Sequence, residues 1–297
     1  MKGWTRVALL AVLCLAVAAP SLQAQGSGRN VEVKVSAEPR LELASYPNPL
    51  AAANDVWMES MTELEVRDAI KAGKTNALIL TGSVELNGPW LTTAKHNNVL
   101  RVSGESIARR MGNMLIAPLV PLEPGDPARS TTPGSFSLSP DIYKGVVRDI
   151  ANSLRAQGFK NVFIVGDSGG NVRADTEVAA GLMTAWKGTG ARAFYIPEYY
   201  DYDEIMIYQR DKLGVDETRY ADRFHDNYYI STMIMVGDPE AVNYSERVRI
   251  GKASINGISL MPIEKSLYHG RQLIEFRTDE TVAGIRKAMA AADTEQR

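Results

Sequence analysis

Residues 158–171 read Gly-Phe-Lys-Asn-Val-Phe-Ile-Val-Gly-Asp-Ser-Gly-Gly-Asn. The run Asn161–Val165 is short and mostly apolar, which is typical of a strand buried on both faces of a sheet. Gly166 and the glycines after it predict a turn, and residues 172–187 predict the helix that comes next. A strand that leads through a short turn into a helix is the unit from which α/β folds are built.

The same alternation extends along the chain on both sides of this stretch. Strands are predicted at 77–81, 114–120 and 193–196. Helices are predicted from a capping box at Thr62–Glu65 to Gly73, at 98–111, from Ser139-Pro140-Asp141 to Gly158, and near 222–236 and 279–293. Strands that alternate with helices of this length imply a parallel sheet with helices on both faces. With no internal repeat, residues 56–297 are predicted to form a single domain.

Composition excludes several classes of protein. The 297 residues include 33 Lys and Arg against 35 Asp and Glu, which argues against a nucleic-acid binder that needs a basic face. A single Cys excludes both a disulfide scaffold and a cysteine-based zinc site. Any chemistry that uses imidazole must therefore draw on His96, His225 and His269, the three histidines of the chain.

The N-terminus predicts an export signal over residues 1–24. Lys2 and Arg6 precede the uncharged apolar run Val7–Ala19, and a small-residue cleavage site ends at Ala24. The run is shorter than the ~20 residues of a membrane-spanning helix, although an uncleaved anchor stays open as the alternative. We expect a periplasmic or secreted protein that has no membrane contact after cleavage and begins with an extended lead-in, residues 25–55.

The predicted architecture also predicts where a site would lie. In open α/β sheets, ligands bind beyond the carboxyl ends of the strands. Two glycine-rich segments with charged residues occupy such ends: residues 82–89, Gly-Ser-Val-Glu-Leu-Asn-Gly-Pro, and residues 166–171. Glycine at a strand-to-helix turn is also commonly structural, so each segment alone leaves both interpretations open.

Gly166, Ser168 and Gly170 match the Gly-x-Ser-x-Gly elbow of serine hydrolases, with the required strand before and helix after. His225 or His269 would follow the serine as its base, but no His-Gly-Gly-Gly oxyanion segment lies upstream. Residues 166–170, Gly-Asp-Ser-Gly-Gly, also resemble the nucleophile segment of chymotrypsin-like proteases. Those enzymes are β-barrels, so the α/β pattern excludes that interpretation.

Five blocks of sequence resemble a different family. Residues 82–91, Gly-Ser-Val-Glu-Leu-Asn-Gly-Pro-Trp-Leu, resemble the Gly-Ser-x-Glu-x-His-Gly-Pro-His-Leu segment of the creatininase family of amidohydrolases. His96 follows where that family has a metal-bridging Asp, and residues 132–138, 158–171 and 225–232 resemble three further family segments in the same order. The resemblance spans roughly residues 82–232.

The resemblance implies a three-layer α/β/α sandwich with a mainly parallel central sheet, often assembled as a homohexamer. Members of the family hydrolyse C–N bonds in cyclic or simple amides, so the implied partner is a small-molecule substrate. They use one or two divalent metal ions, usually zinc or manganese, to activate a water and polarise the carbonyl.

The chain departs from the family pattern at most of the metal ligands. Asn87 and Trp90 replace two histidines, His96 replaces the bridging Asp, and Ser168 replaces the histidine after the third strand. Ile230 and Arg129 stand at two further family positions, a Glu and a His respectively. Asparagine, tryptophan and isoleucine cannot replace an anionic or imidazole ligand, so the usual two-metal site is not predicted.

The candidate residues that remain support three hypotheses. The catalytic candidates are Glu85, His96, Asp167, Ser168 and His225; the substrate-binding candidates are Asn87, Trp90 and Asn171. One divalent metal held by Glu85, His96 and His225, with Asp167 as a possible fourth ligand, is the first hypothesis. A metal-free hydrolase, with His96 or His225 as base and Ser168 or a water as nucleophile, is the second. A catalytically degenerate binding or structural protein is the third.

Several of these residues also have a purely structural interpretation. Glu85 can cap a helix or pair with Lys95, and His269 beside Gly270 resembles a surface turn. The tyrosine-rich stretch at 195–202 favours an oligomer contact over a pocket lining.

Overall fold

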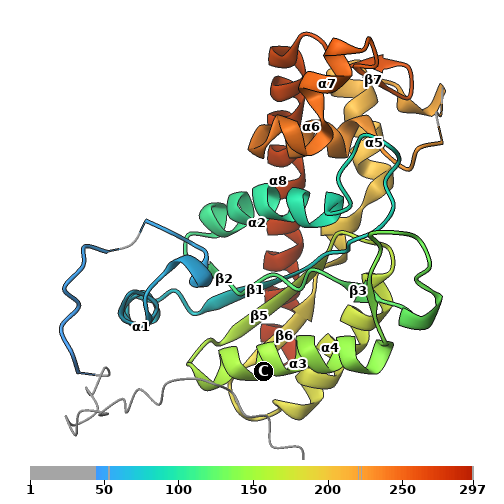
Figure 1. The fold of residues 1–297 in the computed structure, drawn as a ribbon. Helices are drawn as coiled ribbons and strands as arrows, with labels where there is room; N and C mark the ends of the chain where they lie inside the picture. Colours follow the sequence, from blue (N-terminus) through green and yellow to red (C-terminus); the bar gives the residue numbers. More distant parts are fainter. Residues whose placement is uncertain (1–44, 53, 220, 222, 296–297) are drawn as a thin grey trace, which may run out of the picture. The chain divides into compact units, whose positions relative to one another are not determined.

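Four parallel strands form the central sheet of the protein (Figure 1). A computed structural model describes residues 45–295 apart from residues 53, 220 and 222. The strands are β1 (Asn76–Thr81), β2 (Met114–Ile116), β5 (Asn161–Gly166) and β6 (Arg192–Tyr195), in the order β2-β1-β5-β6. β1 and β5 pair along their whole length, from Asn76 opposite Asn161 to Thr81 opposite Gly166. Their carboxyl ends therefore lie side by side.

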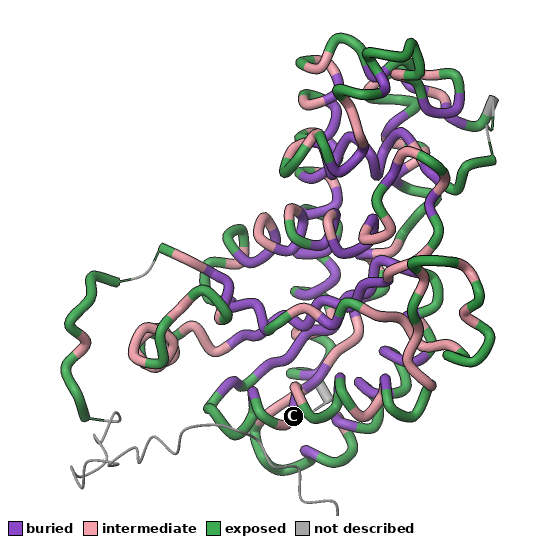
Figure 2. The backbone as a smooth tube through the Cα atoms, in the orientation of Figure 1, coloured by how far each residue is buried: buried purple, intermediate pink, exposed green. Residues whose placement is uncertain are grey.

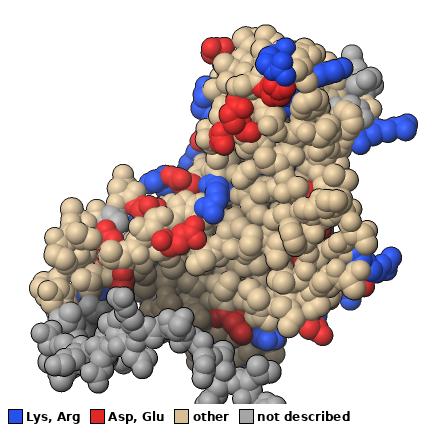
Figure 3. Space-filling view, in the orientation of Figure 1, with Lys and Arg blue, Asp and Glu red and all other residues tan. Residues whose placement is uncertain are grey.

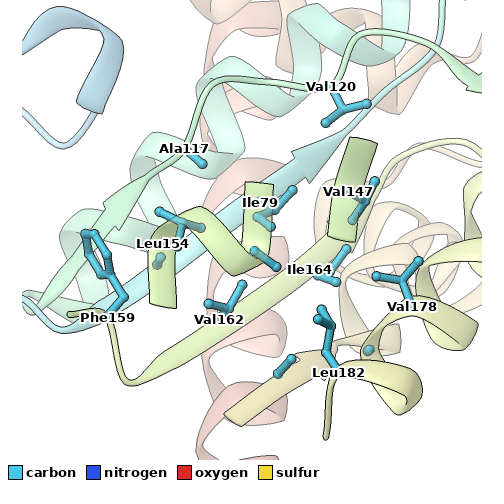
Figure 4. Packing of buried hydrophobic residues seen from close by; sticks show 14 of the residues in the cluster. Ile79, Ala117, Val120, Val147, Leu154, Phe159, Val162, Ile164, Val178 and Leu182 are labelled. Carbon is cyan, nitrogen blue, oxygen red and sulfur yellow. The ribbon is translucent and has the colours of Figure 1, made fainter. Parts of the chain in front are cut away.

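Helices cover both faces of this sheet because successive strand residues point to opposite sides. Ile79, Val162 and Ile164 pack against α3 (Pro140–Ala156) and α4 (Asn171–Ala185), as Figure 4 shows. The opposite face packs against α2 (Lys95–Met111) and α8 (Ile263–Glu295), and it is formed by Leu78, Leu80, Phe163 and Val165. In Figure 2 the buried backbone follows the strands and these helices. The arrangement has the three α/β/α layers predicted from the sequence.

Helix boundaries test the capping signals of the sequence. α1 (Glu63–Lys71) begins with the predicted capping box, in which Thr62 and Glu65 each accept from the other's backbone N–H. α3 begins at Pro140 as predicted, but the side chain of Ser139 makes no capping hydrogen bond, so this part of the prediction was wrong. Proline at the first helical position, with its fixed φ, is sufficient to start that helix.

The 33-residue helix α8 is the longest element, and only its second half was predicted. It packs on α2, α5, α6 and the segment Pro197–Tyr200, and Figure 1 shows it, in red, passing from α6 to the sheet. His269, expected at a surface turn, is buried within α8 instead, 3.1 Å from the Tyr228 hydroxyl. The turn prediction failed because Gly270 lies inside the helix, where it permits a close approach to α6.

A second group of helices packs around the first half of α8. It consists of α5 (Tyr202–Leu213), α6 (Tyr228–Gly237) and α7 (Tyr244–Arg249), which share one apolar cluster with α8. α6 begins six residues after the predicted start at 222, because Arg223 and His225 have positive φ and cannot lie in a helix. A buried ion pair between Asp226 and Arg247 joins the start of α6 to α7.

Short elements complete the described part of the chain. They are β3 (Glu123–Pro124), which pairs in parallel with β4 (Ser137–Leu138), the hairpin of β7 (Ser254–Ile255) and β8 (Ile258–Ser259), and the 3₁₀ turns Met58–Ser60, Pro127–Arg129, Pro197–Tyr200, Glu217–Arg219 and Pro239–Val242. The predicted strand 114–120 is strand only to Ile116, with one further bridge from Val120 to Thr81.

The predicted signal and most of the predicted lead-in, residues 1–44, lie outside the described residues. Within the described ranges, no helix is both long enough and apolar enough to cross a membrane. The described residues belong to one compact unit, Glu42–Arg297.

The spacing of α6 and α8 generates a stability prediction. A Cβ at Gly270 would lie 2.1 Å from the carbonyl oxygen of Thr232, whereas a Cβ at Gly181 of α4 would meet nothing within 4 Å. Gly270→Ala should therefore lower the free energy of unfolding by about 2 kcal/mol through overpacking. Gly181→Ala, the matched control, should raise it by about 0.5–1 kcal/mol because alanine is the better helix former. Urea unfolding measures both; a Gly270→Ala variant as stable as wild type would contradict the close packing.

Candidate functional site

Two loops meet at the carboxyl edge of the sheet and form the candidate site. The segment after β1 carries Glu85 and leads into α2, whose first turn contains Lys95 and His96. The turn after β5 carries Asp167 and Ser168. Because β1 and β5 are paired neighbours, these residues come together although 71 positions separate His96 from Asp167.

His96 lies between two carboxylates. Its Nδ1 is 2.8 Å from Asp167 Oδ2, and its Nε2 is 2.6 Å from Glu85 Oε1. A doubly protonated ring can donate to both carboxylates at once, and the hydrogen bonds to them raise the pKa of His96, which favours this imidazolium form. Asp167 is buried, while the Glu85 side chain is 21% exposed. Glu85 is therefore the end of this chain that solvent reaches.

Lys95 adds a second cation to Glu85. Its buried Nζ lies 3.4 Å from Glu85 Oε1 and 3.3 Å from the carbonyl oxygen of His225, to which it donates. The structural interpretation in which Glu85 pairs with Lys95 is thus confirmed. It does not exclude a chemical role, because Glu85 Oε2 has no hydrogen-bond partner among the described residues.

Arg277 is the residue of this cluster that the sequence did not predict. Its Nη1 donates to Asp167 Oδ1 at 2.8 Å, and both side chains are almost fully buried. Its guanidinium lies over the rings of Tyr199, at 4.4 Å, and Tyr229, at 6.0 Å. Arg277 comes from the middle of α8, so the site is completed by a helix from the far end of the sequence.

Burial and charge act in opposite directions on the pKa values of the cluster. Burial alone would raise the pKa of Glu85, but the hydrogen bond from His96 and the charges of His96 and Lys95 lower it to about 2. Burial would lower the pKa of His96, but its bonds to Asp167 and Glu85 raise it above the usual value. Burial lowers the pKa of Lys95, and the nearby carboxylates offset part of that effect.

Ser168 does not meet a histidine. Its hydroxyl donates to Glu123 Oε2 at 2.5 Å and accepts from the backbone N–H of Gly170. Glu123 comes from β3, a two-residue strand that the sequence analysis did not predict. A Cβ at Gly170 would lie 2.6 Å from Glu123 Oε2, so the carboxylate fills the space that a side chain there would take. The elbow is thus paired with a carboxylate instead of the predicted imidazole.

Asn171 forms part of a buried polar network behind the site. Its amide donates to the Tyr143 hydroxyl at 2.9 Å, and Tyr143 in turn donates to Asp175 at 2.7 Å. Thr81 donates to the other Asp175 oxygen at 2.7 Å. Asp175 is fully buried, and burial raises its pKa to about 7 although the hydrogen bonds from Thr81 and Tyr143 lower it.

The other predicted residues lie at the margin of the cluster or outside it. Asn87 is buried, and its amide donates to the backbone of Glu85 and so holds its own loop. Trp90 lies outside the cluster, with its ring under the guanidinium of Arg247 from α7. His225 is exposed, bonds the carbonyl of Leu86, and keeps its Nδ1 3.9 Å from Glu85 Oε1.

Two tyrosines of residues 195–202, Tyr199 and Tyr200, lie beside the site. Tyr199 is fully buried against Arg277, and its hydroxyl lies 2.8 Å from Ser103 Oγ. The Tyr200 hydroxyl approaches Gly169 closely enough to lie 3.2 Å from a Cβ built there. The preference for an oligomer contact was therefore wrong for the fully buried Tyr199, and for the rest of the stretch it stays a prediction.

The donor geometry does not fit the predicted metal ion. Two ligand atoms on one tetrahedral zinc ion lie about 3.3 Å apart, but both His96 nitrogens contact carboxylate oxygens at 2.6 and 2.8 Å. Asp167 and Glu85 are also engaged by Arg277 and Lys95. Across the described ranges, no group of three His, Cys, Asp or Glu side chains is arranged to hold a metal.

Known proteins share this fold. The family model described as "Creatininase: Creatinine amidohydrolase" matches residues 59–283. A solved structure named Creatininase Mn is 16% identical with a TM-score of 0.55, and the match covers 80% of this chain and 98% of that chain. A mutant creatininase of Zn-Zn type is 16% identical with a TM-score of 0.52, covering 81% and 99%. A creatinine amidohydrolase is 15% identical with a TM-score of 0.53, covering 81% and 98%.

No curated protein matches the chain. At these identities the structural matches concern the fold, and they confirm the α/β fold class predicted from the sequence. The manganese and zinc in two of the names belong to those relatives, and the side chains at the corresponding edge of this sheet are paired with one another.

Asp175 generates a prediction on stability and pH. A carboxyl whose pKa is raised by folding from 3.8 to about 7 favours the folded state at low pH, and this contribution is lost as pH rises from about 4 to 7. Asp175→Asn removes the titration. Its free energy of unfolding relative to wild type should therefore improve by up to about 4 kcal/mol between pH 4 and pH 8.

Urea unfolding at the two pH values measures this difference. The exposed Asp149 of α3 supplies a matched control, since Asp149→Asn should follow wild type at both values. An Asp175→Asn variant whose stability difference from wild type is independent of pH would show that Asp175 is ionised throughout.

Proposed function

Because the chain belongs to the creatininase family, we propose that it is an exported hydrolase that cleaves a C–N bond in a small cyclic or simple amide. The observation that carries this proposal is the Asp167–His96–Glu85 chain at the carboxyl edge of the sheet, which ends in a carboxylate that solvent reaches. The resemblance of residues 82–91 to the family segment includes this same Glu85.

Glu85 is the residue that acts on the substrate in this proposal. His96 and Lys95 hold its Oε1, which leaves Oε2 as the acceptor available to a water. Glu85 takes a proton from that water as the oxygen attacks the carbonyl carbon, and returns the proton to the nitrogen as the C–N bond breaks. The positive charges of Lys95 and His96 stabilise the negative charge that develops on the carbonyl oxygen. No metal takes part in these steps.

Ser168 supports a second candidate reaction. Its hydroxyl is bonded to Glu123, so a carboxylate instead of a histidine would remove its proton. The covalent serine mechanism depends on Ser168 and Glu123, whereas hydrolysis by water depends on Glu85. Substitution of these residues one at a time therefore distinguishes the two mechanisms.

Partners and location follow from the family and from the sequence. On the face seen in Figure 3, Lys and Arg side chains lie in small groups among Asp and Glu and form no continuous basic surface, which agrees with a small-molecule substrate. Export rests on the signal-like pattern of residues 1–24. Assembly as a homohexamer rests on the family resemblance alone.

Substitution of Glu85 tests the proposed base. Glu85→Gln keeps the shape of the side chain but cannot accept a proton, so kcat on creatinine or another cyclic amide of a substrate panel should fall by about 10²–10⁴-fold. Glu123→Gln and Ser168→Ala, the matched controls on the same edge, should change kcat by less than about tenfold.

Each other outcome of this assay has a definite meaning. Loss of activity in Ser168→Ala and Glu123→Gln, with Glu85→Gln active, assigns the reaction to the serine. A wild-type protein that turns over no amide of the panel, but melts at higher temperature in the presence of one, contradicts hydrolysis and identifies a binding protein.

The pH dependence of the rate tests the same residue independently. A base with a pKa of about 2 stays ionised far below neutral pH, so kcat/KM should hold as pH falls from 7 to 4. A neutral His96 acting as base would behave in the opposite way, because the activity would fall with pH through a pKa raised above 6.5. A rate profile with an acidic limb near or above pH 6.5 would therefore move the role of base from Glu85 to His96.

A further inference from the structure

The cations of the site already outnumber the carboxylates that they contact. Glu85 and Asp167 carry two negative charges, and Lys95 and Arg277 carry two positive charges in direct contact with them. The imidazolium of His96 lies between the carboxylates and adds a third positive charge. A divalent cation at this position would raise an existing positive excess in a buried region, which is strongly unfavourable.

Both cations are fixed in place. Arg277 is 2% exposed, and its guanidinium lies over the rings of Tyr199 and Tyr229 while it donates to Asp167. An arginine does not lose its proton inside proteins, so this charge persists at every working pH. The Lys95 side chain is 4% exposed and also donates to the backbone of His225, which directs its ammonium toward Glu85.

Side chains that replace the family's metal ligands have structural partners in this chain. Asn87, where the family has a histidine, holds the backbone of its own loop. Ser168, where the family has another histidine, bonds Glu123. Lys95 and Arg277 form ion pairs with the two carboxylates at the centre of the cluster, Glu85 and Asp167.

We propose that Lys95 and Arg277 are built-in cations that take the place of the divalent metal ions, so that this site functions without binding a metal. Arg277 is a positioning residue: it holds Asp167, which orients His96, which in turn orients Glu85. The proposal concerns the charge of the site and holds whichever substrate the site accepts.

Metal content and thermal stability test the proposal directly. Full-length mature protein, purified without chelator from cells supplied with Zn²⁺ and Mn²⁺, should contain less than about 0.1 ion per chain by elemental mass spectrometry. Excess Zn²⁺ or Mn²⁺ should leave its melting temperature unchanged, because bound ligand would raise it. About one ion per chain, lost in Glu85→Ala or His96→Ala, would overturn the proposal.

Charge removal supplies the second arm. Arg277→Met leaves Asp167 buried without its cation and should lower the melting temperature by about 10 °C. Asp167→Asn combined with Arg277→Met removes both charges and should recover at least half of that loss. The matched control is Arg247→Met, which breaks the buried pair with Asp226 outside the site, and Asp167→Asn should not rescue it.

The two arms separate this proposal from the proposed reaction. An Arg277→Met variant that melts within about 2 °C of wild type would overturn the proposal, because the buried charge would then be dispensable. Metal content and melting temperature do not depend on turnover. These two measurements therefore test the proposal of built-in cations even if the protein has no amidase activity.

Discussion

The ion pair between Arg277 and Asp167 joins the long helix α8 to the carboxyl edge of the sheet. Both side chains are buried, and a buried pair that loses one partner costs about 3–5 kcal/mol. The same Asp167 carboxylate accepts from His96, so the orientation of the imidazole, and through it that of Glu85, depends on this pair. The position of α8 against the sheet therefore also determines the orientation of the side chains in the site.

Much of the fold could be predicted because its central strands carry their own signal. The runs 77–81 and 161–165 were predicted as strands, and the structure has β1 and β5 at Asn76–Thr81 and Asn161–Gly166. Buried parallel strands are apolar on both faces, which makes them distinct in sequence. The first half of α8 was not predicted, because Gly270, which allows the close contact with α6, was interpreted as part of a turn.

The site could be predicted only where the chain order itself brings residues together. Glu85 and Asp167 follow neighbouring strands, so their proximity follows from the topology. Arg277 lies 110 residues after Asp167 on a helix rich in charged residues, and its local sequence does not distinguish it from a surface arginine. Glu123, the partner of Ser168, comes from a two-residue strand that is too short for any periodic pattern.

The continuity of α8 limits how this family member can change. The helix is about 50 Å long. It carries His269 against α6, Arg277 at the site and Ile285 in the apolar cluster against the sheet, and these three residues span about 24 Å. Insertion of one residue between His269 and Arg277 would rotate the guanidinium by about 100° around the helix axis. The number of residues between His269 and Arg277 is thus fixed. Insertions and deletions are expected in the loops of this protein and not in this part of α8.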